Sequence, residues 1–376
     1  MMHAFAPTAL LLAIAATTGC TQRLGQSDAA LALEDISAGY ESSRLKRRTP
    51  APERRPVEYE IAERRYHGDT YVSPEGTLAG IMLVPGVVAK GKDDPRLVAL
   101  AQTLARMRFA VFVPDMKGLR QLRVRVSDVR EVADGFRYLA SRTDLAPSGR
   151  AGIAGFSYGA GPVMLAALEK DIRDRVDFIL ALGGFHDAQH TITYFTTGYF
   201  RDETTGKWRH LEQNLYGVWV FARSYVELAT RAEDRKRLTR YFEELAAERQ
   251  FSKMRMLPGL APDAQALQTL LMNRDPERVP ALVAQLSPSM RREMEGLNPA
   301  TRDLRQLEAQ MILIHGRGDN IIPFTESIAL VKALAPEQVE LFLIDGLAHV
   351  ELKLMRQDVP ILLRAMESLL ARRANE

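Results

Sequence analysis

The sequence predicts an α/β fold in which a mostly parallel, doubly wound sheet is interrupted by an inserted helical segment. Three observations support this prediction. Short continuous apolar runs, typical of strands buried on both faces, alternate with segments of helical periodicity. The alternation stops after Gly184, and it resumes near residue 300. Repeated strand–helix units place helices on both faces of a parallel sheet.

The first half of the sheet is predicted from residue 57 onward. Two antiparallel edge strands are expected over 57–66 and 70–73. Buried strands are expected over 79–86 (AGIMLVPG), 109–115 (FAVFVPD), 150–157 (RAGIAGFS) and 176–184 (VDFILALGG). Between them, apolar residues recur at helical spacing over 94–106, 126–139 and 162–170.

The segment between residues 185 and 299 breaks this rhythm. It contains no convincing strand, has its own helical periodicity and is too long for a loop, which indicates a helical cap inserted at 186–299. The sheet resumes with a strand at 309–316, a helix at 325–334, a strand at 339–346 and a closing helix at 358–373. The core therefore comprises 57–185 and 300–376.

The N-terminal residues indicate export. Residues 1–19 hold an apolar run too short to span a bilayer, as in a secretory signal peptide. The ending TTGC resembles a bacterial lipoprotein box, which predicts lipidation of Cys20 and a membrane anchor. Two alternatives are a soluble exported protein, for which Ala13-Ile14-Ala15 offers an ordinary cleavage site, and a start that is not cleaved or is misread. The polar, proline-containing stretch 20–56 is expected to be a flexible tether, because Pro50, Pro52 and Pro56 forbid a continuous helix there.

The composition excludes several classes of function. The 50 basic and 47 acidic residues nearly balance, which gives no reason to expect a nucleic-acid partner. The single cysteine excludes an internal disulfide. The sequence has no CxxC pair, HExxH, Walker loop or GxGxxG, so no metal or nucleotide cofactor is expected.

The pentapeptide GFSYG at 155–159 is the strongest catalytic motif. It joins a predicted buried strand to a predicted helix, the context that a nucleophile elbow requires. Ser157 would sit in a tight turn, and Gly155 and Gly159 would let the strand and the helix approach without a clash. Ser157 is therefore the candidate nucleophile, with an ordinary turn as the alternative interpretation.

A serine nucleophile needs a histidine base and a carboxylate to orient that base. Among the seven histidines, His349 alone lies beyond the carboxyl end of a late strand, where sites of parallel sheets are built. Asp319, in HGRGDNIIPF, follows the strand at 309–316 and is the candidate acid, with Asp187 as a substitute. A surface histidine and a turn-capping aspartate are the structural alternatives.

Together the elbow GFSYG, the acid loop GRGDNIIP and the histidine loop DGLAHVEL resemble the α/β-hydrolase family. The order Ser157, Asp319, His349 and the three strand ends carry the resemblance, which covers about two-thirds of the chain. The core is similar to that of dienelactone-hydrolase-like members, although those have a cysteine nucleophile. The resemblance implies an oxyanion hole formed by the backbone N–H groups of Tyr158 and Val87.

These residues predict a cell-envelope serine hydrolase that cleaves a small-molecule ester or related acyl substrate through an acyl-enzyme on Ser157. Acyl transfer or peptide hydrolysis by the same triad, and a non-catalytic binding lipoprotein, are the alternatives. The cap segment TITYFTTGYF at 191–200 either lines an acyl or aromatic pocket or packs the cap on the sheet. Arg201 and Arg209 are expected on the surface, with binding of an anionic substrate as the other possibility.

Overall fold

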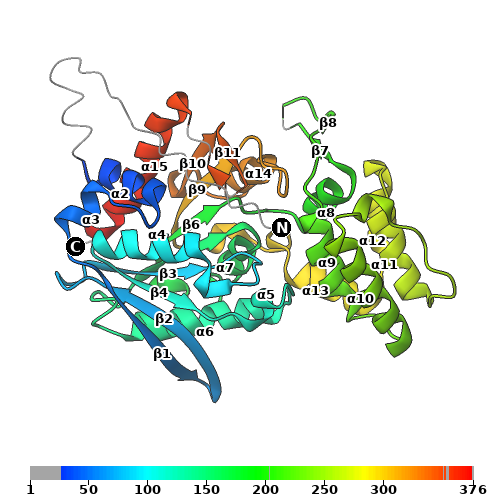
Figure 1. Cartoon of the computed structure of the whole chain (residues 1–376), viewed down its shortest axis with the longest axis horizontal. Coiled ribbons are helices and arrows are strands. Elements are labelled where there is room, and N and C mark those ends of the chain that lie inside the picture. The colour runs from blue at the N-terminus through cyan, green and yellow to red at the C-terminus, as the bar shows by residue number, and fades with distance from the viewer. Residues whose placement is uncertain (1–26, 203, 350, 353–354, 375–376) are drawn as a thin grey trace.

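A central eight-stranded sheet organises the molecule. The structure, a computed structural model, describes residues 27–202, 204–349, 351–352 and 355–374 (Figure 1). The strand order is β1-β2-β4-β3-β5-β6-β9-β10; β1 and β2 pair antiparallel at one edge, β2 is antiparallel to β4, and all further neighbours are parallel. The strands are β1 (Glu53–Ile61), β2 (Arg64–Val72), β3 (Ala79–Val84), β4 (Phe109–Pro114), β5 (Ala151–Phe156), β6 (Val176–Leu182), β9 (Gln310–Gly316) and β10 (Val339–Ile344).

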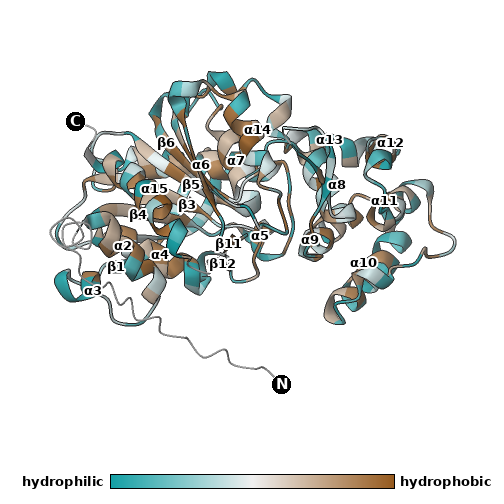
Figure 2. Ribbon diagram, turned by 90° about the horizontal axis from the view of Figure 1, so that it is seen from above, coloured by the Kyte–Doolittle hydropathy of each residue, from teal (hydrophilic) through white to brown (hydrophobic). Residues whose placement is uncertain are grey.

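Helices cover both faces of this sheet, as the alternating pattern predicts. One face packs against α2 (Asp28–Ala38), α4 (Pro95–Arg106) and α15 (Val359–Ala371). The other packs against α6 (Ser127–Ser141), α7 (Ala160–Ala166) and α14 (Thr325–Ala333). Hydrophobic residues concentrate on the central strands between these layers (Figure 2). Burial of this apolar surface is the main favourable contribution to folding.

The residues between β6 and β9 form a mainly helical region at one end of the molecule (Figure 1). Its helices are α8 (Ala188–Thr197), α9 (Tyr216–Val226), α10 (Ala232–Ala247), α11 (Pro262–Met272), α12 (Val279–Ala284) and α13 (Pro288–Gly296). The expectation that this segment contains no strand is wrong, because β7 (Tyr199–Arg201) and β8 (Trp208–His210) pair antiparallel. Three-residue strands are too short to produce a recognisable alternation.

The predicted flexible tether also needs correction for the residues that the structure describes. Helix α2 is N-capped by Ser27, and α3 (Arg44–Arg48) is N-capped by Ser43. Leu31 and Leu45 are buried against the core face that carries α4 and α15. The prolines at 50, 52 and 56 follow both helices and therefore do not interrupt them. Residues 1–26, with the predicted signal peptide and Cys20, lie outside the described residues.

The first predicted edge strand is in fact a hairpin. Strand β1 begins at Glu53, four residues earlier than expected, and the chain reverses at Ala62 and Glu63 before β2. Both turn residues have positive φ, 47° and 63°. Such two-residue turns usually carry Asn or Gly, so this sequence gives no turn signal.

Short elements complete the described fold: α5 (Lys117–Arg120), β11 (Leu347–Ala348) and β12 (Glu351–Leu352). No helix among the described residues is long and apolar enough to cross a membrane.

Candidate active site

The strand-to-helix elbow places Ser157 at the carboxyl end of β5. Ser157 has a φ of +54°, which is unusual for a residue other than glycine, and it opens a 3₁₀ turn that leads into α7. A Cβ atom on Gly155 would lie 2.6 Å from the Ala160 Cα, and one on Gly159 would lie 2.6 Å from the Pro85 carbonyl oxygen. Only glycine fits at both positions, so GFSYG is a strained elbow and the ordinary-turn interpretation is wrong.

His349 and Asp319 meet at the same edge of the sheet. The His349 Nδ1 atom lies 2.9 Å from Asp319 Oδ2, with the imidazole 12% exposed and the carboxylate fully buried. The other Asp319 oxygen accepts hydrogen bonds from the backbone N–H groups of Ile321 and Ile322. When Nδ1 donates its hydrogen to Asp319, Nε2 is the nitrogen that carries no proton in the neutral imidazole, and it can act as the base.

Charge complementarity keeps Asp319 ionised in this buried position. Burial alone raises the pKa of a carboxyl group, but His349 and His315 both face Asp319 and hold its pKa well below the usual range. The negative charge can therefore stabilise a positively charged His349 during proton transfer.

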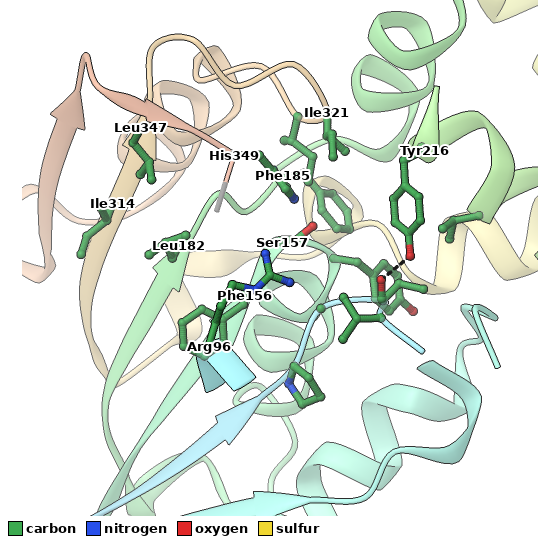
Figure 3. Close-up of a pocket in the computed structure, with 18 of the residues that line it drawn as sticks. Arg96, Phe156, Ser157, Leu182, Phe185, Tyr216, Ile314, Ile321, Leu347 and His349 are labelled. Carbon is green, nitrogen blue, oxygen red and sulfur yellow. Dashed lines mark hydrogen bonds between the residues drawn. The ribbon is translucent and has the colours of Figure 1, made fainter. Parts of the chain in front are cut away.

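Ser157 and His349 line one cavity, and their side chains face the same space (Figure 3). Among the described residues, no hydrogen bond joins the Ser157 hydroxyl to the imidazole. Catalytic hydrogen bonds are often long before substrate binds and tighten in the substrate complex. The structure thus brings Asp319 and His349 into direct contact and places Ser157 beside them.

Two residues that the sequence interpretation passed over support the pair. His315, fully buried in β9, has Nε2 3.0 Å from the Ile322 carbonyl oxygen and 3.3 Å from Asp319 Oδ2. Its Nδ1 lies 2.7 Å from the Ser327 hydroxyl, so both ring nitrogens have hydrogen-bond partners. A Cβ atom on Gly183 would lie 3.3 Å from Asp319 Oδ2, so a larger residue there would press on the acid.

The loop after β3 approaches the nucleophile closely. A Cβ atom on Gly86 would lie 3.2 Å from the Ser157 Cβ, and the next residue, Val87, lines the cavity with Ser157 and Tyr158. Tyr216 at the start of α9 donates a hydrogen bond from its hydroxyl to the Val87 carbonyl oxygen, at 2.7 Å. Burial raises the pKa of Tyr216 to about 12, so its hydroxyl keeps the proton that it donates. The inserted helices therefore hold the loop that carries the predicted oxyanion donor.

A hydrogen bond to the core holds the side chain of Tyr158, the residue after the nucleophile. Its hydroxyl donates a hydrogen bond of 2.8 Å to Asp128 on α6, which also accepts from the Arg125 backbone N–H. Burial raises the pKa of Asp128 to about 6, despite the opposing effect of these two hydrogen bonds. The residue after the nucleophile is thus attached to the core by a buried carboxylate.

The cavity around Ser157 measures about 800 Å³ and is lined mainly by apolar side chains, within the usual size of small-molecule sites. Phe195 and Ile192 of the segment TITYFTTGYF line it, whereas Tyr194 hydrogen-bonds to the Asp319 carbonyl oxygen and Phe200 packs against Phe324. One part of the segment therefore lines the cavity, and another part packs the insertion on the core. Arg201 and Arg209 lie away from the cavity and pair with Glu277 and Asp202.

The substitute acid Asp187 finds no support in this geometry. Within the described residues, no three His, Cys, Asp or Glu side chains gather as a metal site. Asp187, the substitute acid, N-caps α8 by accepting hydrogen bonds from the backbone N–H groups of Gln189 and His190. Asp187 contacts α8, whereas Asp319 contacts His349, so the geometry favours Asp319 as the acid.

The fold and this arrangement of residues define a serine hydrolase with the α/β-hydrolase fold. The chain belongs to the X-Pro dipeptidyl-peptidase (S15) family, whose match spans residues 118–350. No curated protein matches the sequence. A solved structure with similar architecture is that of a proposed hydrolase from Legionella pneumophila, with a TM-score of 0.56 and 12% identity, over 93% of this chain and 96% of that one.

Two further solved structures are more distant. The acylaminoacyl peptidase of Pyrococcus horikoshii has 14% identity and a TM-score of 0.49, over 85% of this chain and 41% of that one. This chain therefore spans less than half of the peptidase. A proposed lipase from Acinetobacter baumannii has 15% identity and a TM-score of 0.46, over 97% of this chain and all of that one.

Proposed function

We propose that this protein hydrolyses carboxylic esters through an acyl-enzyme on Ser157. The Ser157 hydroxyl attacks the substrate carbonyl while His349 Nε2 takes its proton and then passes it to the leaving alcohol. Water, activated by the same imidazole, then hydrolyses the acyl-enzyme. The contact between His349 Nδ1 and Asp319 Oδ2, on a cavity shared with Ser157, is the observation that supports this chemistry most directly.

Backbone N–H groups stabilise the negative charge of the tetrahedral intermediate in this mechanism. The N–H groups of Tyr158 and Val87 are the proposed donors, since both residues line the cavity beside Ser157. Removing one such donor costs about 3 kcal/mol of transition-state stabilisation. The hydrogen bonds from Tyr158 to Asp128 and from Tyr216 to the Val87 carbonyl restrain both sides of the proposed hole.

Peptide hydrolysis is the second candidate, because the family match is to X-Pro dipeptidyl-peptidases. An enzyme that selects a free peptide N-terminus needs an acceptor for the ammonium group. Among the described cavity-lining residues, the one carboxylate is Asp94, which accepts hydrogen bonds from the Arg96 backbone and guanidinium. The mainly apolar lining and this engaged carboxylate favour an ester over a peptide with a free amino group.

The test compares p-nitrophenyl acyl esters with the p-nitroanilides of Gly-Pro and Ala-Pro, using wild type and Ser157→Ala. A fluorophosphonate probe should label wild type and leave Ser157→Ala unlabelled. Ester cleavage that far exceeds anilide cleavage, and that is lost in Ser157→Ala, is the expected result. Faster cleavage of the anilides would favour the peptidase. Ester cleavage that persists in Ser157→Ala would contradict the proposed nucleophile.

A further inference from the structure

The cavity at Ser157 continues into the core on the side of the sheet covered by α2, α4 and α15. Phe156 and Leu182 end β5 and β6, and Ile314 lies two residues before the end of β9. Leu182 pairs with Phe156 on one side and with Ile314 on the other. They form one cross-strand row, and all three line the cavity. Phe156 directly precedes Ser157, so this row begins next to the nucleophile (Figure 3).

The helices above this row leave it partly uncovered. Phe156, Leu182 and Ile314 are half-buried, whereas Ala154, Leu180 and Ile312, one row further from the site, are buried. Protein interiors are normally close-packed, with few voids larger than a water molecule. The space above this row of large apolar side chains lies next to the nucleophile. A substrate can therefore fill it.

The walls of this part of the cavity come from three helices. Leu33 and Ile36 of α2, Leu100 of α4, and Ala365 and Met366 of α15 line it. Helix α2 is held in place by Asp35, which is buried and accepts hydrogen bonds from Ser43 and Thr103 and pairs with Lys46. The segment expected to be a tether thus closes one side of the cavity. We call the space between the row and these helices the α2 arm.

A hydrocarbon chain fits the chemistry of the α2 arm. The side chains named above are all apolar. Arg96 of α4 also lines the cavity near Phe156, but it is solvent-exposed and pairs with Asp94 (Figure 3). A peptide in this arm would bury N–H and C=O groups without side-chain partners, at a cost of roughly 2 kcal/mol or more for each group. A methylene chain has no such groups and gains from transfer out of water.

We propose that the α2 arm binds one long aliphatic chain of the ester substrate, which makes this protein a hydrolase of lipid-like esters. This inference rests on the proposed function, because it assigns part of the substrate to the Ser157 site. The chain belongs either to the acyl group or to the leaving alcohol, and the chemistry of the arm is the same in both cases.

The first test measures how fast alkyl fluorophosphonates of graded chain length label Ser157. The second-order rate constant should rise by up to roughly fourfold for each methylene that enters the arm, until the arm is full. Ile36→Trp and Ala365→Trp each fill part of the arm. Relative to their own rate with the shortest probe, these variants should lose roughly 15-fold for every two methylenes that no longer fit.

Two matched controls use solvent-exposed neighbours on the same helices. Ser37→Trp on α2 and Arg364→Trp on α15 add the same side chain outside the arm and should keep the wild-type chain-length profile. Labelling with the shortest probe reports whether each variant is folded. Two arm variants on different helices keep the test decisive if one of them is unstable.

Two ester series then identify which side of the substrate carries the chain. A chain-length gain among p-nitrophenyl esters of graded acids assigns the arm to the acyl group, and a gain among acetates of graded alcohols assigns it to the leaving group. Labelling of Ser157 at a rate independent of chain length would overturn the inference and leave the proposed function intact. A tryptophan variant with the full wild-type profile would also overturn it. Failure of every probe to label Ser157 would contradict the proposed function itself, and this inference with it.

Discussion

The carboxyl edge of the sheet and the helical insertion both border the cavity, but they contribute different things. The sheet edge supplies Ser157, Asp319 and His349, each at or just beyond the end of a strand. The insertion supplies mostly apolar walls and hydrogen bonds to the backbone of the site loops, among them those from Tyr216 to the Val87 carbonyl and from Tyr194 to the Asp319 carbonyl. Groups that transfer protons must be placed to within fractions of an ångström, and strand ends of a packed sheet provide that precision.

This difference explains why the reacting residues follow from the sequence while the substrate does not. Strand ends of a parallel sheet converge whatever the loops contain, so motif order alone predicts which side chains meet. An apolar wall can be built from many combinations of side chains, and no motif specifies it. If the comparison is correct, substitutions at the sheet edge should cost far more activity than substitutions in the insertion.

The largest effect is expected for Asp319→Asn. The amide removes the charge that stabilises protonated His349 and disturbs its tautomer, so kcat should fall by about 10⁴-fold. Asp187→Asn is the matched control, because asparagine is an equally good N-cap for α8 and should leave kcat nearly unchanged. Steady-state ester hydrolysis by both variants checks this. Equal losses in the two would mean that Asp187 shares the role of the acid.

A second effect, on the free energy of unfolding, is expected where the sheet core contacts the helical insertion. Asp128 lies on α6 beneath Tyr158, and the pKa of Asp128 is also raised by Glu293 of the insertion helix α13. Because its folded pKa of about 6 lies above the ordinary value of 3.8, the folded protein binds this proton more tightly than the unfolded chain. That contribution, about 3 kcal/mol, is fully present below about pH 4 and lost as the pH rises through about 6.

Asp128→Asn removes this titration. Relative to wild type, the variant should therefore gain unfolding free energy as the pH rises from about 4 to about 7. Urea unfolding at several pH values measures the difference. Burial likewise raises the pKa of neighbouring Glu131 to about 7. The unfolding free energy of wild type should therefore continue to fall above pH 6, but less steeply. Asp174→Asn makes the same chemical change on the surface and serves as the control. A difference between wild type and Asp128→Asn that does not vary with pH would contradict the raised pKa.

The strands and the three candidate catalytic residues could be predicted because each carries a local signal. The buried strands are continuous apolar runs, and Ser157 stands in an elbow whose glycines are required by contacts of 2.6 Å. His315 was visible in LIHGRGD, but only the fold shows that its ring reaches Asp319. Helix α2 was missed because the three prolines after it suggested an irregular segment. Its burial against α4 and α15 is a tertiary effect that local propensity does not report.

The smallest effect is expected for Tyr216→Phe, which tests whether the contact between the insertion and the Val87 loop contributes to the chemistry. The substitution removes the hydrogen bond to the Val87 carbonyl, which is worth about 1 kcal/mol, so kcat should fall by roughly fivefold. Tyr241→Phe removes a hydroxyl that accepts a hydrogen bond from the Arg255 backbone inside the insertion, and it should leave kcat unchanged. A rise in KM with kcat preserved would show that Tyr216 binds substrate and does not position the loop. A loss of kcat for Tyr216→Phe alone would mean that the insertion helps to position the loop carrying Val87, and that the division between the two regions is incomplete at this contact.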